Sequence, residues 1–167
     1  MKLHLSSFRL GEHPEEMRCA DAKNNRVAVI QNARDCWTDS SKRKAAVKRE
    51  CDHLKLLGLE PQEFGLRQVF GRSEAMRKEI SSLANCWVCG GDCCVLRRAY
   101  RLSDFDLLIS ELAEEEAGFV CGGYSAGACV ISPTLEGIHL PDDPDSHPGG
   151  YGTEVLWDGV GCSTIRL

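Results

Sequence analysis

The segment with the clearest potential for chemistry reads Gly123-Tyr124-Ser125-Ala126-Gly127. It lies between a short β-prone run at 119–121 and an apolar helix start at 128–131. A serine framed by glycines at such a junction is typical of a nucleophile elbow, where a sharp turn exposes the hydroxyl and glycines permit close backbone approach. The pattern predicts acyl transfer by Ser125; the alternative is a glycine-rich turn whose serine only caps a helix.

Two backbone amides are candidates for an oxyanion hole beside this serine. The amide of Ala126 opens the predicted helix, where the helix dipole favours a developing negative charge. Gly90 and Gly91 follow a second apolar run, at 85–89, and the Gly91 amide is the second predicted donor. The sequence thus indicates a nucleophile and two oxyanion donors at the ends of two predicted strands.

The ten cysteines offer a different chemistry. Their tightest group is Cys86-x2-Cys89-x3-Cys93-Cys94, a spacing that thiolates could use to hold zinc or an iron–sulfur cluster, or to form a redox module. However, Cys86 and Cys89 lie in a predicted buried strand, where residues three apart point to opposite faces. We therefore interpret most of these cysteines as small buried apolar residues and expect neither a metal nor another cofactor.

Alternating strand and helix signals predict the elements that position these groups. The expected strands cover 2–6, 26–31, 59–66, 85–89 and 119–121, and the expected helices cover 15–22, 39–57, 73–83, 93–100 and a stretch opened by Ser103-x-x-Asp106, which resembles a capping box. Such alternation favours an α/β fold with a mostly parallel sheet covered on both faces.

One expected helix, at 39–57, has a broad apolar face formed by Ala45, Ala46, Cys51, Leu54 and Leu57, with its charges opposite. Gly58 is placed to end it.

The carboxyl ends of parallel strands share one edge of a sheet, and ligand sites form there. Candidate site residues should therefore follow strands, as Ser6-Ser7, Asn32, Gly90-Gly91-Asp92 and the segment 123–127 all do. Any one of these segments alone could equally be an ordinary loop.

Composition limits the partners. The 167 residues suit one domain, and the formal charge of −5 includes no long block of either sign, so neither nucleic acid nor a membrane is an expected partner. No window approaches 18 uninterrupted apolar residues, and the amino-terminal apolar run is too short for a signal peptide. We expect a cytoplasmic location, and the oligomeric state is left open.

The sequence resembles the peptidase E family of serine peptidases, also called aspartyl dipeptidases, to which cyanophycinase is related. The likeness rests on the segments at 3–11, 87–98, 122–130, 133–137, 142–144 and 155–161. The resemblance implies a single domain over 1–167, a three-layer sandwich like that of class I glutamine amidotransferases and flavodoxin, and metal-free hydrolysis of short peptides, often after an N-terminal aspartate.

Carried over residue by residue, the resemblance makes Ser125 the nucleophile and places Gly90 and Gly91 in the loop that lines the oxyanion site. It also points to Gly90 and Asp92 as substrate-binding residues. The triad acid has no firm counterpart: Asp142 is the preferred candidate, Asp143 and Glu136 are weaker, and a solvated turn before Pro144 is the alternative interpretation.

The sequence departs from the family at the triad histidine. The family's histidine follows the segment that corresponds to 157–161, whereas here the sequence continues Cys162-Ser163-Thr164-Ile165-Arg166-Leu167. His139 and His147 lie upstream, in the acidic loop. We therefore expect a domain that lacks its C-terminal part and hydrolyses peptides poorly; a catalytically inactive pseudoenzyme is the alternative.

Overall fold

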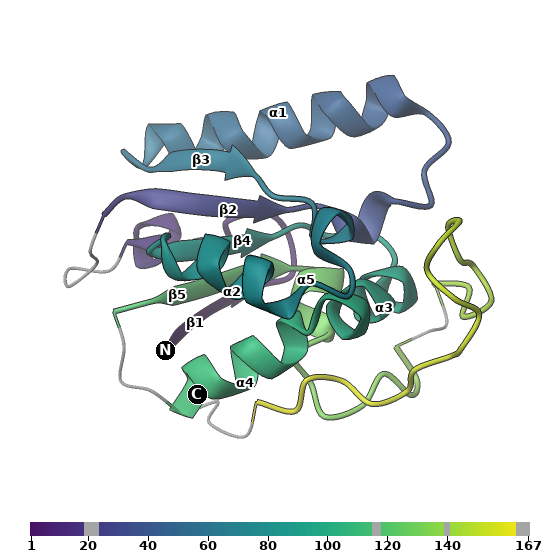
Figure 1. Ribbon diagram of the computed structural model, residues 1–167. Helices are drawn as coiled ribbons and strands as arrows, with labels where there is room; N and C mark the ends of the chain where they lie inside the picture. Colours follow the sequence, from purple (N-terminus) through teal and green to yellow (C-terminus); the bar gives the residue numbers. More distant parts are fainter. Residues whose placement is uncertain (19–23, 115–117, 139–140, 163–167) are drawn as a thin grey trace.

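A single five-stranded parallel sheet organises the chain. The computed structural model describes residues 1–18, 24–114, 118–138 and 141–162. The strands are β1 (Lys2–Ser6), β2 (Arg26–Ile30), β3 (Glu60–Glu63), β4 (Asn85–Val88) and β5 (Val120–Tyr124). Their order across the sheet is β1-β5-β4-β2-β3, and every pair is parallel (Figure 1). The four predicted strands at 2–6, 26–31, 85–89 and 119–121 are thus neighbours, so that part of the prediction is confirmed.

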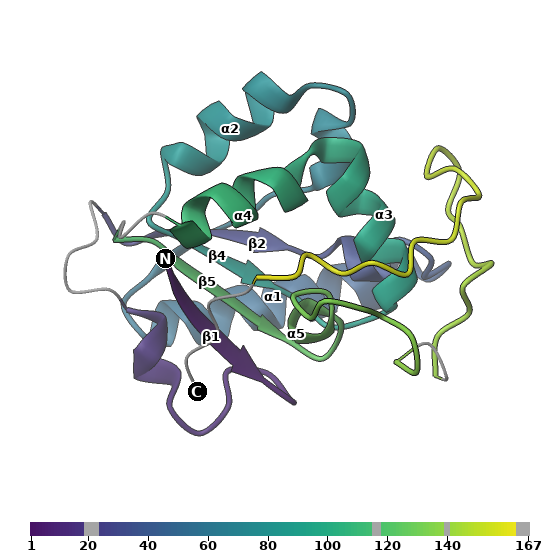
Figure 2. The same ribbon diagram turned by 90° about the horizontal axis from the view of Figure 1, so that it is seen from below.

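Helices cover both faces of the sheet. Helix α1 (Ser40–Leu56) and the 3-10 helix η1 (Pro14–Met17) lie on one face. Helices α2 (Ser73–Ser81), α3 (Cys93–Ser103) and α4 (Phe105–Glu114) lie on the other, as the two perpendicular views show (Figures 1 and 2). The short 3-10 helices η2 (Asn32–Arg34) and η3 (Leu66–Val69) follow β2 and β3, and α5 (Ala126–Cys129) follows β5. This arrangement confirms the predicted α/β three-layer sandwich.

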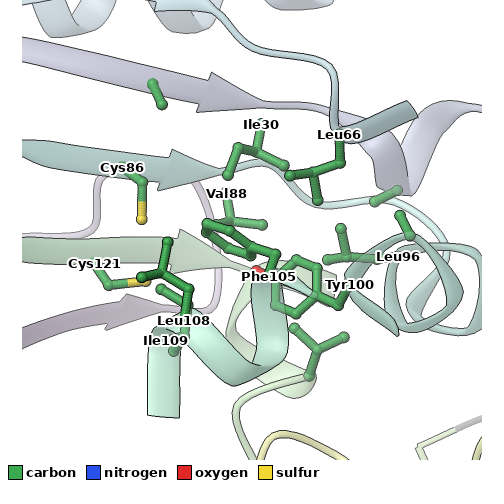
Figure 3. Packing of buried hydrophobic residues seen from close by; sticks show 14 of the residues in the cluster. Ile30, Leu66, Cys86, Val88, Leu96, Tyr100, Phe105, Leu108, Ile109 and Cys121 are labelled. Carbon is green, nitrogen blue, oxygen red and sulfur yellow. The ribbon is translucent and has the colours of Figure 1, made fainter. Parts of the chain in front are cut away.

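Alternation along the strands divides the core in two. Ile30, Val88 and Cys86 point toward α3 and α4, where they pack with the aromatic pair Tyr100 and Phe105 (Figure 3). A second cluster lies beneath α1 and η1 and includes Val27, Val29, Leu54, Trp87 and Cys89. Because both faces of β2 and β4 are buried, their sequences are almost continuously apolar rather than alternating.

The cysteine placement confirms the steric argument made from the sequence. Cys86 belongs to the cluster under α3 and α4, and Cys89 belongs to the cluster under α1. Cys86 pairs in register with Cys121 of β5 on the same face. Across the residues that the structure describes, no group of three or more histidine, cysteine or acidic side chains has metal-binding geometry.

Helix α1 differs from its predicted face. Asp39 caps its start by accepting hydrogen bonds from the Ser41 and Lys42 amides, and Gly58, at φ +75°, follows its end as expected. The inward face, however, carries Glu50 beside Ala46, Val47 and Leu54, whereas Ala45 is exposed. The prediction that all charges face solvent was therefore wrong, because Glu50 has buried polar partners.

The prediction of a capping box that begins at Ser103 was also wrong. Ser103 is the last residue of α3, and its hydroxyl donates to the carbonyls of Ala99 and Tyr100 within that helix. Asp104, in the left-handed region at φ 57°, separates α3 from α4. Asp106 instead accepts a hydrogen bond from Arg97 at 2.8 Å.

Smaller differences concern element lengths. The helix expected at 15–22 is a single 3-10 turn at Pro14–Met17, and residues 19–22 lie outside the described part of the chain. The third strand is shortened to Glu60–Glu63, and β5 runs three residues further than predicted, to Tyr124. That extension carries the strand directly into the elbow.

The segment after α5 lies along the carboxyl-end side of the molecule without regular structure. Over 132–138 and 141–162, only an isolated bridge between Thr134 and Asp158 is formed. Two adjacent buried arginines of α3 hold it: Arg97 donates to the carbonyl and carboxylate of Asp158, and Arg98 donates to the carbonyls of Pro144, Ser146 and Glu154. None of the described helices is both long and apolar enough to cross a membrane.

Candidate active site at the carboxyl edge of the sheet

Ser125 occupies a strained turn between β5 and α5. Its backbone has φ 50° and ψ −118°, a conformation that L-residues with a Cβ rarely adopt. Its amide donates to the carbonyl of Ser6 at the end of β1 (3.3 Å), and its carbonyl accepts from the amides of Ala128 and Cys129. The residue is exposed although both of its chain neighbours are buried. We call this tight strand-to-helix turn, residues 123–127, the elbow, because its shape is the one that a nucleophile elbow requires.

Glycines make this turn sterically feasible. A Cβ built on Gly90 would lie 2.8 Å from the Cβ of Ser125, and one on Gly127 would lie 2.4 Å from the carbonyl oxygen of Val88. A Cβ on Gly123 would lie 2.8 Å from the carbonyl oxygen of Gly127. Contacts this short exclude any side chain, so β4, the loop after it and the elbow interlock through their backbones.

The predicted oxyanion loop lies against the elbow. Gly90 touches Ser125 as described, and a Cβ on Gly91 would lie 2.4 Å from the carbonyl oxygen of Ala33 in η2. That same carbonyl accepts a hydrogen bond from the Asp92 amide at 2.8 Å. Among the described residues, neither the Gly91 amide nor the Ala126 amide has a hydrogen-bond acceptor. Two donors are therefore available on either side of the contact between Gly90 and Ser125.

Asp92 and Asp142 both lie at the start of α3. The Asp92 carboxylate accepts from the Val95 amide (2.8 Å) as the helix N-cap, and Asp142 accepts from the Cys93 amide (2.9 Å). Burial raises the pKa of Asp92, and the neighbouring charge of Asp142 raises it further. The structure thus brings Asp142 next to the predicted oxyanion loop. The weaker acid candidates are exposed: Asp143 accepts from the Asp145 amide, and Glu136 follows the bridge at Thr134.

Two thiols near this edge, Cys93 and Cys94, have a pKa that burial raises. Cys93 is almost fully buried, and burial, followed by the nearby Asp142 carboxylate and Cys129 thiol, raises its pKa well above the usual value. Burial also raises the pKa of Cys94 to about 11. Since the thiolate is the nucleophilic form, neither cysteine competes with Ser125 as a nucleophile near neutral pH.

The histidines do not complete a triad within the described part of the chain. The His4 ring contacts the carbonyl of Leu10 (2.9 Å), His13 pairs with Glu15, and His53 lies on α1. His147 is exposed in the segment held by Arg98, and His139 lies outside the described residues. No hydrogen bond joins a described histidine to Ser125.

A buried polar network, which the sequence analysis did not predict, contacts the residue that precedes Ser125. The Tyr124 hydroxyl donates to the Glu50 carboxylate (3.0 Å) and accepts from Arg34, and the Trp87 indole N–H donates to the other Glu50 oxygen at 3.4 Å. Arg34 is 3% exposed and Glu50 is 1% exposed, and their charged atoms lie 3.7 Å apart. Tyr124 immediately precedes Ser125, so the network holds the last strand residue before the turn.

The network excludes Tyr124 as an ionisable catalytic group near neutral pH. Burial raises the pKa of its hydroxyl to about 12 even though the Arg34 guanidinium lowers it. The sequence did contain a signal that Glu50 is buried, because Glu50 lies four residues from both Ala46 and Leu54 and therefore on the same face of α1. No spacing pattern links Arg34 or Tyr124 to it across the chain.

Comparison with known proteins supports the fold. No protein-family model and no curated protein matches this sequence. Among solved structures, a proposed peptidase E protein from Listeria monocytogenes superimposes with a TM-score of 0.73 at 23% sequence identity, covering 97% of this chain and 75% of its own. The chain therefore has a peptidase E-like fold, which agrees with the three-layer sandwich that the resemblance implied.

Proposed function

We propose that this chain carries a serine-peptidase site of the peptidase E kind, with Ser125 as the nucleophile. The observation that carries the proposal is the exposed Ser125 in a strained turn at φ 50°, at the carboxyl edge of a parallel sheet. Strain of this kind costs about 1–3 kcal/mol and concentrates at functional sites. A serine that only capped a helix would not need that conformation, and its side chain makes no cap hydrogen bond to α5.

The proposed reaction is hydrolysis of a peptide bond in two steps. The Ser125 Oγ attacks the carbonyl carbon and loses its proton to a base, and the carbonyl oxygen becomes an oxyanion. The amides of Gly91 and Ala126 stabilise that charge because they have no described acceptor within the protein. The C–N bond then breaks as the amine takes a proton, and water releases the acyl group from Ser125.

The proposed substrates are short peptides that begin with aspartate. A Cβ on Gly90 would lie 2.8 Å from the Ser125 Cβ and 2.9 Å from the Tyr124 ring, so only glycine fits against the proposed nucleophile. Asp92 is the proposed partner of the substrate's amino group, and Asp142 is the proposed triad acid. Both carboxylates lie at the start of α3, directly after the oxyanion loop.

The second candidate function is a pseudoenzyme that retains the scaffold. It is favoured by one observation, namely that no described histidine contacts Ser125. A serine without a positioned base is a poor nucleophile, and loss of a triad member leaves a rate enhancement on the order of 10³–10⁴ over water. We therefore expect slow rather than efficient hydrolysis.

Hydrolysis of aspartyl p-nitroanilide, with and without added imidazole, distinguishes the two candidates. We expect slow release of p-nitroaniline that disappears in Ser125→Ala, and a further increase with imidazole that also requires Ser125, since imidazole can replace an absent base. Equal release by the wild type and Ser125→Ala, under both conditions, would leave only the pseudoenzyme.

His139→Ala and His147→Ala serve as further variants in the same assay. If both retain the slow wild-type rate, neither histidine acts as the base. Rates typical of an efficient peptidase, abolished by one of these changes, would show that the loop supplies a complete triad.

A further inference from the structure

The loop that follows β1 presents an exposed aromatic ring beside the elbow. Phe8 is 65% exposed, so most of its ring faces solvent. A hydrogen bond joins the start of this loop to the elbow, because the Ser125 amide donates to the carbonyl of Ser6, two residues before Phe8. The Phe8 ring also lies edge-to-face with the Tyr124 ring, with centroids 6.4 Å apart at 79°.

The backbone of this loop is strained in a way that holds the ring in place. Arg9 adopts φ 48°, which is costly for a residue with a long side chain, and its guanidinium lies over the Phe8 ring at 4.7 Å. The Ser6 hydroxyl donates to the Arg9 carbonyl, and the Gly11 amide donates to the Phe8 carbonyl at 3.3 Å. These contacts of Ser6, Arg9 and Gly11 keep the Phe8 ring on the surface rather than in the core.

The surroundings of the ring belong to the proposed active site. Tyr124, which Phe8 contacts, is adjacent to Ser125 in the chain, and its ring edge lies 2.9 Å from the position of a Cβ on Gly90. Ser125 lies 2.8 Å from that same position. The Tyr124 ring is itself buried, at 6% exposed, so of this aromatic pair only the Phe8 ring is open to solvent.

We propose that Phe8 is a specificity-determining residue that packs against an apolar side chain of the peptide substrate. The inference rests on the proposed function and deepens it. In a dipeptide that begins with aspartate, the first side chain is charged, so the apolar side chain is that of the second residue. The protein should accordingly prefer Asp-Leu and Asp-Phe to Asp-Gly.

Dipeptide binding to the Ser125→Ala protein tests this inference without turnover. Dissociation constants for Asp-Gly, Asp-Leu and Asp-Phe are measured by isothermal titration calorimetry. We expect the apolar dipeptides to bind about tenfold more tightly than Asp-Gly, because part of an apolar side chain is removed from water. The additional change Phe8→Ala should reduce that preference to about twofold or less, whereas Phe8→Leu should retain most of it.

Leu56→Ala is the matched control. Leu56 is also a large exposed apolar residue, at 85%, but it ends α1 on the opposite edge of the sheet from the elbow (Figure 1). Its removal should leave the preference unchanged. Since Phe8 is mostly exposed, circular dichroism should show that Phe8→Ala folds normally.

The remaining outcomes distinguish the role of Phe8 from the proposed peptidase site. Equal binding of all dipeptides to the Ser125→Ala protein, or a preference that persists in Phe8→Ala, would overturn the role of Phe8 and leave the proposed peptidase site intact. Absence of any dipeptide binding would also overturn the role of Phe8. Ser125-dependent hydrolysis, measured separately, decides the peptidase site itself.

Discussion

The elbow and the segment that follows it are built on different principles. The elbow interlocks with β4 through backbone contacts that leave no room for side chains at Gly90, Gly123 or Gly127. The segment over 141–162 forms no helix or strand. Side chains from other elements hold it, among them the guanidinium groups of Arg97 and Arg98 and the Asn32 amide that bonds to the buried Tyr151. Ser125, the proposed nucleophile, is therefore positioned by the sheet, whereas Asp142, the proposed acid, lies in a segment that side-chain contacts hold.

This difference shows where the proposed site is rigid and where it can vary. Backbone interlocking tolerates almost no substitution, because neighbouring atoms in the strands cannot shift. A loop held by hydrogen bonds to carbonyl groups can loosen locally, since water can replace the lost donors. We expect substitutions in the elbow to affect global stability and substitutions among the anchors to affect mainly the segment.

The largest effect is expected for Gly127→Ala. Its methyl group would lie 2.4 Å from the Val88 carbonyl oxygen, so the strand or the turn must move. We expect a loss of about 3 kcal/mol in the free energy of unfolding, measured by urea denaturation. Gly149→Ala is the control, because a Cβ there meets no atom within 4 Å. Equal stability of the two variants would show that the elbow is not interlocked as described.

A smaller and more local effect is expected for Arg98→Met. The change keeps apolar packing but removes the donors to three carbonyls, of Pro144, Ser146 and Glu154. We expect a loss of about 1–2 kcal/mol and faster hydrogen exchange over 144–154. Arg101→Met, which removes a half-exposed partner of Asp158, should have less effect on both. Unchanged exchange over 144–154 in Arg98→Met would contradict the anchoring role.

The smallest effect is expected for Asp92→Asn, at the junction of the two regions. Burial raises the pKa of Asp92 in the folded protein, so ionisation at neutral pH disfavours the folded state. Asparagine still caps α3 and carries no charge. The variant should be slightly more stable than the wild type at neutral pH. The difference should shrink as the pH falls through the folded-state pKa of Asp92 and should vanish below the unfolded-state pKa.

Asp39→Asn provides the comparison for that pH dependence. Asp39 caps α1 in the same way but is exposed, so its replacement should give no gain in stability at neutral pH. Thermal unfolding of both variants between about pH 3 and pH 7 measures the effect. A gain from Asp92→Asn that is constant across this range would argue against a raised pKa as its cause.

The amino-acid sequence by itself determined the α/β class, the four neighbouring parallel strands and the glycine-framed strand-to-helix turn at Ser125. These features depend on local patterns: buried apolar runs in β2 and β4, crossovers long enough for parallel pairing, and glycines spaced around one serine. The pattern of Gly123 and Gly127 is informative because a strained serine requires small neighbours within a few residues of the chain.

Only the tertiary structure decided which distant side chains meet. The sequence placed Glu50 among the solvent-facing charges of α1, yet contacts with Arg34 and Tyr124, 16 and 74 residues away, make it a buried support of the elbow. Ser103 was expected to begin a helix but ends one. Asp142 accepts a hydrogen bond at the start of α3, and Arg98 of the same helix binds the segment that follows Asp142. Buried polar groups are stable only with their partners, and the partners come from elements brought together by the whole fold.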